Sequence, residues 1–136
     1  MKDMKETVAR SEPLPPGGMS TRAILAGLGA SLVTALACSV LVALIFYTVD
    51  LTPNYQALAV SLINGLSFVV GGAYAGRSAR SLGWLHGAVT AGLFVLLALV
   101  FALVVFPGLP GWLILFRRLA VALAVGALAG IIGVNL

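Results

Sequence analysis

Charged residues are confined to a few short segments of this chain, and the stretches between them are long and apolar. No Asp, Glu, Lys or Arg occurs in residues 23–49, 51–76, 81–116 or 119–136. An uncharged apolar run of about 20 residues is long enough to cross a bilayer as a helix. These runs predict an all-α fold: a polytopic membrane protein with four transmembrane helices in an antiparallel bundle.

The composition agrees with insertion into a membrane. The 136 residues are 61% hydrophobic and only 9% charged, with a mean hydropathy of +1.13, whereas soluble domains carry about 25% charged residues. The net charge of +4 could suggest nucleic acid. However, the basic residues are split among short segments and form no groove with interleaved aromatic residues. We therefore expect the lipid bilayer as a partner, and no nucleic acid.

Proline, glycine and charged residues mark the turns between the spans. They fall around Pro53, at Arg77–Leu82 and at Pro107–Gly111. The predicted spans are about 23–47, 55–76, 84–106 and 112–136.

Residues 112–118 of the last span have two interpretations. They either begin a single long helix, with Arg117 and Arg118 extending back to the outer interface, or form a short interfacial helix that precedes a span over 119–136. We favour the second interpretation.

The first 20 residues mix both signs of charge and then become rich in Pro and Gly, as in MKDMKETVARSEPLPPGGMS. Such a segment buries too little apolar area to offset its ordering entropy, so we expect residues 1–20 to form a flexible, disordered cytoplasmic tail. Residues 21–136 form the transmembrane domain, with Ser20 or Thr21 as the expected N-cap of the first helix.

The basic residues also predict the orientation, because cytoplasmic segments are enriched in Lys and Arg. With the amino terminus inside, the cytoplasmic set is Lys2, Lys5, Arg10, Arg22, Arg77 and Arg80, and the outer set is Arg117 and Arg118. We therefore expect a multi-pass protein of the bacterial cytoplasmic membrane with both termini in the cytoplasm. Lipid headgroups or a partner could contact Arg77, Arg80, Arg117 and Arg118.

Each span carries small residues at steps of three or four, which places them on one helix face. Small side chains let helix backbones approach closely in lipid, and two Gly-x-x-x-Gly pairs are typical of such contacts. The glycines predicted to pack between helices are Gly27, Gly65, Gly72, Gly76, Gly87, Gly126, Gly130 and Gly133.

Three polar residues inside the spans are candidates for a ligand site. Asn64 lies near the middle of the second span, where its amide needs a hydrogen-bond partner, and the commoner role is a bond between helices. Thr90 can bond to its own helix. His86, the single histidine, could relay protons, although we favour an interfacial histidine solvated by headgroups.

An enzyme is not expected from these residues. The chain has one His, one Cys and four acidic residues, which lie mostly in the tail. No acid–base pair, activated nucleophile or metal cluster can be assembled from this set. We expect no metal and no cofactor.

Two strings resemble a known family. GGAYAGRSAR at residues 71–80, followed by GWLHG at 83–87, and the final GALAGIIGVNL at 126–136 resemble a small four-span membrane-protein family of Firmicutes, a group of unknown function. The resemblance covers roughly residues 20–136. It implies the four-span topology and no activity.

Two functions remain open. The first is a non-enzymatic helix-packing protein, acting as a homo-oligomer or as an accessory subunit of a membrane assembly. The alternative is a small transporter or channel with a polar path near Asn64, Thr90 and His86.

Overall fold

The computed structural model describes residues 18–49, 52–105, 108 and 111–136. All regular secondary structure in the described part is helical, and the four helices are long and apolar enough to cross a membrane. The all-α class with four spans is thus confirmed, and the chain is a multi-pass membrane protein. The helices are α2 (Thr21–Thr48), α3 (Asn54–Ala79), α4 (Gly83–Val105) and α5 (Trp112–Asn135).

The helix bounds lie close to the predicted spans, but the start of α5 differs from the favoured interpretation. It is one continuous helix from Trp112 to Asn135, with no break at Arg118, where we had favoured a separate short helix. The run WLILFRRLAVAL contains no Pro or Gly that would interrupt the backbone hydrogen bonds. Of the predicted tail, residues 1–17 lie outside the described residues.

Local chemistry explains where the helices begin and end at one end of the bundle. Ser20 is the N-cap of α2, as predicted, and its hydroxyl accepts a hydrogen bond of 3.4 Å from the Ala23 N–H. In the turn between α3 and α4 at the same end, α3 ends at Arg80, whose backbone is in the left-handed region with φ of 55°. Its N–H donates to the Gly76 carbonyl at 3.2 Å, which caps the helix.

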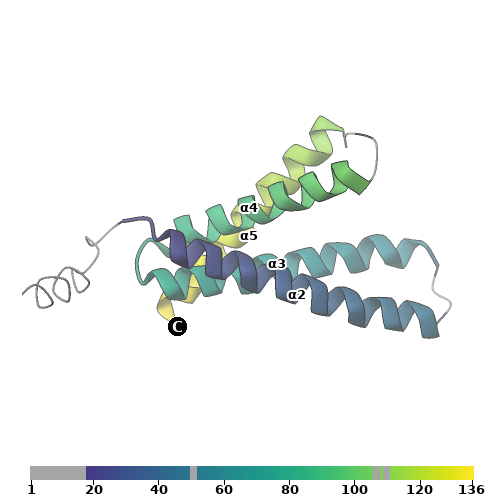
Figure 1. Ribbon diagram of the computed structural model, residues 1–136, viewed down its shortest axis with the longest axis horizontal. Coiled ribbons are helices and arrows are strands. Elements are labelled where there is room, and N and C mark those ends of the chain that lie inside the picture. The colour runs from purple at the N-terminus through teal and green to yellow at the C-terminus, as the bar shows by residue number, and fades with distance from the viewer. Residues whose placement is uncertain (1–17, 50–51, 106–107, 109–110) are drawn as a thin grey trace, which may run out of the picture.

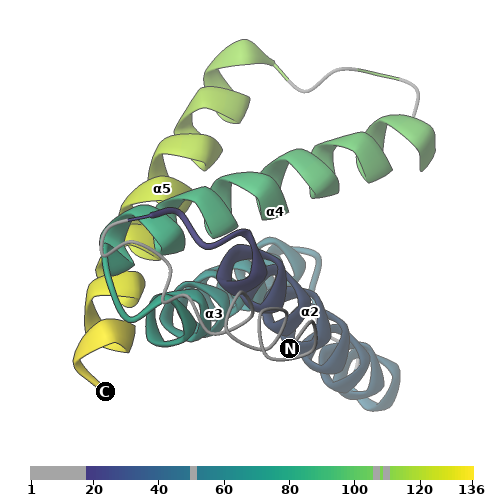
Figure 2. The same cartoon turned by 60° about the vertical axis from the view of Figure 1, so that its left-hand side comes forward.

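The helices form two hairpins, α2 with α3 and α4 with α5, which are joined by the short turn between Ala79 and Gly83 (Figure 1). Helix α3 contacts all three other helices, whereas the described parts of α2 and α5 do not contact each other. Figures 1 and 2 show that the hairpins are close together at the end with the α3–α4 turn and diverge toward the other end.

We name these two ends by their packing. The closed end contains the start of α2, the α3–α4 turn and the carboxy terminus of α5 (Figure 1). The open end contains the end of α2, the start of α3, the end of α4 and the start of α5 (Figure 1). The buried residues of α2, Ala23 to Ser31, are all in the half next to the closed end.

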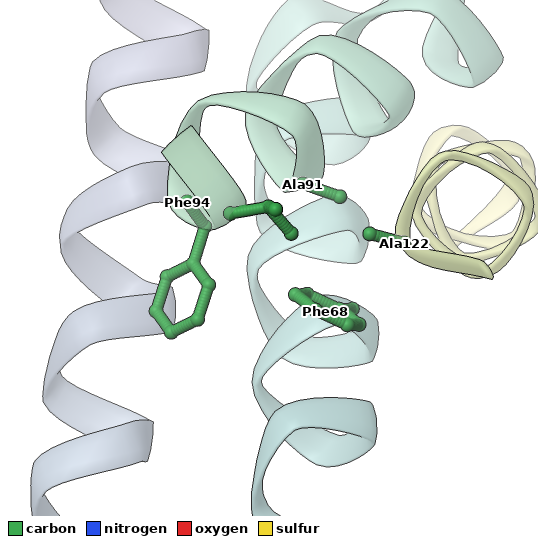
Figure 3. Close-up of a cluster of buried hydrophobic side chains, with 5 residues drawn as sticks. Phe68, Ala91, Phe94 and Ala122 are labelled. Atoms are coloured by element: carbon green, nitrogen blue, oxygen red, sulfur yellow. The ribbon is translucent and has the colours of Figure 1, made fainter. Parts of the chain in front are cut away.

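A small hydrophobic cluster lies where the hairpins begin to diverge. Its members come from α3, α4 and α5, and Figure 3 shows Phe68, Ala91, Phe94 and Ala122. The Phe68 and Phe94 rings meet edge to face, with centroids 5.6 Å apart and an interplanar angle of 87°. This arrangement is favourable for aromatic pairs, so the cluster links the two hairpins at the point where close helix packing ends.

Candidate functional site

The contact between α2 and α3 is made by small residues. A Cβ built on Gly27 would lie 2.6 Å from the Ala75 Cβ and 2.7 Å from the Gly71 carbonyl oxygen. In return, a Cβ on Gly71 would overlap the Ser31 hydroxyl, which donates to the Gly27 carbonyl at 3.1 Å. Any larger side chain at Gly27 or Gly71 would force the helices apart.

Helix α3 meets α5 through a second set of small residues on a different side. A Cβ on Gly72 would lie 2.8 Å from the Gly126 carbonyl oxygen, and one on Gly76 would overlap the backbone of Gly130. Gly133 likewise faces the backbone of Ala73. The Gly72-x-x-x-Gly76 pair of α3 therefore faces the Gly126-x-x-x-Gly130 pair of α5.

Helix α4 approaches α5 in the same way. Built Cβ atoms on Gly83 and Gly87 would overlap the backbone of Gly130 and Gly126 respectively. In the reverse direction, a Cβ on Gly126 would lie 2.5 Å from the Ala91 Cβ and 2.5 Å from the Gly87 carbonyl oxygen. Gly126 and Gly130 are thus touched by α3 and by α4, and neither helix leaves space for a methyl group.

Gly65 behaves differently from the other predicted packing glycines. No heavy atom of the described residues outside its own helix backbone and chain neighbours lies within 4 Å of a Cβ built there. Other small residues are exposed toward the open end, namely Ser61 on α3, four residues before Gly65, and Ala98 and Ala102 on α4. The small faces of α3 and α4 therefore extend beyond the region in which they meet another helix.

These uncovered small residues line a cleft between α3 and the α4–α5 hairpin. The cleft has a volume of about 1010 Å³. Phe68, Phe94 and Val95, which belong to the hydrophobic cluster, also line it. Because the hairpins diverge toward the open end (Figure 1), the cleft lies between the diverging halves of the bundle and has the aromatic cluster at its base.

The α3 wall of the cleft carries the polar residues Gln56, Ser61 and Asn64. The Ser61 hydroxyl donates to the Ala57 carbonyl of its own helix at 2.9 Å. Among the hydrogen bonds of the described residues, none involves the side-chain amide of Gln56 or Asn64. The half-buried Asn64 amide thus faces the cleft without a partner from this part of the chain.

The α5 wall of the cleft contributes Arg117 and Arg118. Both arginines are exposed. The four acidic residues, Asp3, Glu6, Glu12 and Asp50, all lie outside the described residues, so the described part of the chain has basic side chains and no acidic side chain. The cleft consequently combines apolar walls, small residues, two amides and two guanidinium groups.

His86 lies at the closed end, where its side chain is buried and hydrogen-bonded within the chain. It is 0% exposed, so the interpretation as a headgroup-solvated histidine is wrong. The Ser20 N–H donates to Nε2 at 2.9 Å, and Nδ1 lies 3.0 Å from the Leu82 carbonyl oxygen. This pattern requires a neutral imidazole with its proton on Nδ1. The ring therefore attaches the start of α2 to α4.

Thr90 and His86 do not join Asn64 in one polar path. Thr90 is fully buried, and its hydroxyl donates to the His86 carbonyl at 2.7 Å. Neither residue lines the cleft, whereas Asn64 does. Every buried side-chain nitrogen or oxygen in the described part of the chain has a hydrogen-bond partner, so neither Thr90 nor His86 carries an unpartnered polar atom.

The remaining charged candidates are at the closed end. Arg77 lies in the last turn of α3 and Arg80 follows that helix, and both side chains are exposed. They are therefore separated from Arg117 and Arg118 by most of the bundle length. Among the described residues there is no group of three His, Cys, Asp or Glu side chains that could hold a metal ion.

Two further glycines and one hydrogen bond contribute to the packing of the closed end. Gly83 and Gly71 pack as closely as the predicted glycines. The sequence indicates both: Gly71 lies beside Gly72, and Gly83 shares the small face of the third span with Gly87. The Ser20–His86 bond joins residues 66 positions apart, and no spacing rule relates them.

The comparisons with known proteins agree with the resemblance noted in the sequence. No curated protein and no solved structure matches the chain. A family model described as "Protein of unknown function (DUF3792)" matches residues 20–133. The expected uncharacterised family is thereby confirmed, while the assignment to Firmicutes stays a prediction. Because the match covers most of the sequence, the chain belongs to the DUF3792 family of proteins of unknown function.

Proposed function

We propose that this chain is a non-enzymatic helix-packing protein that acts as a homo-oligomer or as an accessory subunit of a membrane assembly. Its partner supplies a transmembrane helix that fills the cleft at the open end. The observation that supports this most strongly is the uncovered small face of α3 in the cleft, Ser61 and Gly65.

The closely packed glycines themselves do not provide a surface for a partner. Gly72, Gly76, Gly126 and Gly130 contact helices of the same chain. A partner must therefore use a different part of the small faces. Ser61 and Gly65 on α3 and Ala98 and Ala102 on α4 provide small walls that let another helix backbone approach closely.

The size of the cleft fits part of a helix. A helix about 10 Å across that rises about 1.5 Å per residue occupies roughly 120 Å³ per residue. The cleft of about 1010 Å³ therefore accepts roughly eight residues, or about two turns. Two turns of close contact extend the packing of the closed end toward the open end without changing the fold.

A transporter or channel is less well supported as a function. Of its three expected polar residues only Asn64 lines the cleft, whereas Thr90 and His86 form hydrogen bonds within the chain away from the cleft.

We propose that the protein resides in the bacterial cytoplasmic membrane. Its closed end, with Arg22, Arg77 and Arg80, then faces the cytoplasm, in agreement with the enrichment of basic residues on that side.

The size of the complex in native membranes tests this function. The tagged protein is extracted in mild detergent, and its mass is compared with those of Gly65→Leu and of Gly29→Leu. Gly29 on α2 is an exposed control with nothing within 4 Å. We expect wild type and Gly29→Leu to form a complex larger than one chain, and Gly65→Leu to remain folded but monomeric.

Two outcomes would contradict the proposal. One is a monomeric wild type without a bound protein partner. The other is a Gly65→Leu complex of unchanged mass and amount. Circular dichroism on each variant shows whether the helices have formed, so that misfolding is not taken for loss of the partner.

A further inference from the structure

We propose that the helix that fills the cleft belongs to a different protein and carries an acidic side chain at the level of Arg117 and Arg118. This inference rests on the proposed function and specifies the partner of the same cleft. It would favour the accessory-subunit form of that function over the homo-oligomer.

The first argument is the charge of the cleft. Arg117 and Arg118 are adjacent and both line it. They begin about 7 Å along α5 from Trp112, at about 1.5 Å per residue, so they lie inside the helix and not in a loop. A charged side chain next to apolar walls is stabilised by an opposite charge, and an acidic side chain binds guanidinium groups with directed hydrogen bonds.

The second argument separates a foreign helix from a second copy. None of the four helices of this chain contains Asp or Glu. A helix of a second copy would therefore bring no negative charge to Arg117 and Arg118, and a helix such as α5 would add two more positive charges. Like charges in close proximity favour dissociation. An acidic helix from another chain is the complementary occupant.

The third argument is the side-chain amide of Asn64, which lies further into the cleft than the two arginines. Asn64 lies about 15 Å along α3 from Asn54, at about 1.5 Å per residue, and its amide has no partner among the described residues. A polar side chain one to two turns away from the acid on the incoming helix would satisfy this amide. The arginines attract the helix and the amide fixes its register, because an unpaired amide in an apolar environment is unfavourable.

The small walls also favour a helix over a lipid. An anionic lipid could place its phosphate at Arg117 and Arg118 and its chains in the cleft. However, flexible acyl chains do not require residues as small as Gly65, Ala98 and Ala102 along their path, whereas close helix approach does. An anionic lipid is therefore treated as an alternative outcome of the experiment.

The experiment uses a synthetic helix as the probe. A 24-residue Leu/Ala peptide with one Gly-x-x-x-Gly face carries a single Asp six residues from one end, and its control carries Asn at that position. Each is added to the full-length protein in phosphatidylcholine vesicles, and association is measured by energy transfer between a dye on the peptide and one on a cysteine introduced at Leu58. The native Cys38 is replaced by Ser.

We expect the Asp peptide to bind about tenfold or more tightly than the Asn peptide, because one additional charge-assisted pair changes the binding free energy by at least about 1.4 kcal/mol. The preference should disappear in the Arg117→Gln/Arg118→Gln double variant. It should be unchanged in the Arg77→Gln/Arg80→Gln variant, whose altered residues are at the closed end.

Each other outcome overturns the inference in a distinguishable way. Equal binding of both peptides rejects the acidic partner but leaves helix docking intact, whereas binding of neither peptide removes both proposals. If phosphatidylglycerol stabilises wild type but not the Arg117→Gln/Arg118→Gln variant, and neither peptide competes with it, the occupant is a lipid. If self-association requires both Arg117 and Asp50, the occupant is a second copy.

Discussion

The closed and open ends of the bundle use similar residues in different ways. At the closed end, Gly72 and Gly76 of α3 touch the backbone of α5 so closely that a methyl group does not fit. At the open end, Ser61 and Gly65 of the same helix line a cleft of about 1010 Å³. A small residue therefore allows helix contact in lipid, but contact also requires a matching helix at the correct angle.

The angle is set by the closed end. Three helix pairs meet there through glycines, and the His86 ring attaches the start of α2 to α4. Once the backbones are in contact at one end, any crossing angle separates the helices at the other end. The cleft is thus a geometric consequence of close packing at the closed end, and changes at the two ends should have unequal effects.

The largest difference between the ends is expected from leucine substitutions on α3. Gly76→Leu would overlap the Gly130 backbone, and we expect it to lower the free energy of unfolding by about 3 kcal/mol or more. Gly65→Leu has open space and should leave the fold intact. Steric trapping in bicelles measures both. Equal losses in the two variants would show that the ends do not differ in packing.

A pair of alanine substitutions on α2 makes the comparison sharper. Gly27→Ala places a methyl group 2.6 Å from the Ala75 Cβ, and a loss of about 1–3 kcal/mol in the free energy of unfolding is expected. Gly29→Ala has no neighbour within 4 Å and should be neutral or stabilising by up to about 1 kcal/mol, because Ala favours the helix. A stable Gly27→Ala variant would argue against the α2–α3 contact.

The bond between α2 and α4 should contribute a smaller amount. His86→Leu leaves the Ser20 N–H without its acceptor, and we expect the free energy of unfolding to fall by about 1–3 kcal/mol. His86→Gln keeps an acceptor on a similar length of side chain and should recover part of the loss. Hydrogen exchange at the Ser20 amide gives the local measurement. Fast exchange of the Ser20 amide in wild type, or no recovery of stability in His86→Gln, would show that this hydrogen bond does not form.

The smallest effect on stability is expected in the cleft. Asn64→Leu removes an amide that bonds to no described residue, so the free energy of unfolding should change by no more than about 0.5 kcal/mol. Binding of a helix in the cleft should weaken in the same variant. A large loss of fold stability would mean that Asn64 bonds within the chain, and that the cleft is closed by the protein itself.

The topology could be predicted because it depends on local properties. Uncharged runs of sufficient length give the spans, and Pro53 or the Arg77–Leu82 segment gives the turns, without knowledge of contacts. The helix bounds consequently differ little from the prediction. The continuity of α5 through Arg118 was one of two interpretations and not the favoured one, because polar residues beside an apolar run permit either a long helix or a separate interfacial one.

The contacts were less predictable because they depend on the crossing angle. The spacing of Gly126 and Gly130 indicates a close contact, but it does not specify that α3 and α4 meet the same two residues. Nor does it distinguish Gly72, which packs, from Gly65, which does not. His86 could not be placed either, because its partner is a backbone N–H at a distant position in the sequence.

The most direct test of the unequal ends is a pair of distances between spin labels in nanodiscs, in the absence of a partner. With Cys38 replaced by Ser, one pair joins α3 to α4 at the open end, through cysteines at the exposed residues Leu58 and Val104. The other pair joins them at the closed end, through cysteines at Tyr74 and Trp84.

Packed helix axes are about 8–10 Å apart, and the account predicts a narrow distribution consistent with this separation at the closed end. At the open end it predicts a distinctly longer distance that cannot be reconciled with packed axes. Distances at the open end that match packed helices would show that the hairpins close in the membrane. That result would contradict the central claim that the helices are closely packed at only one end of the bundle.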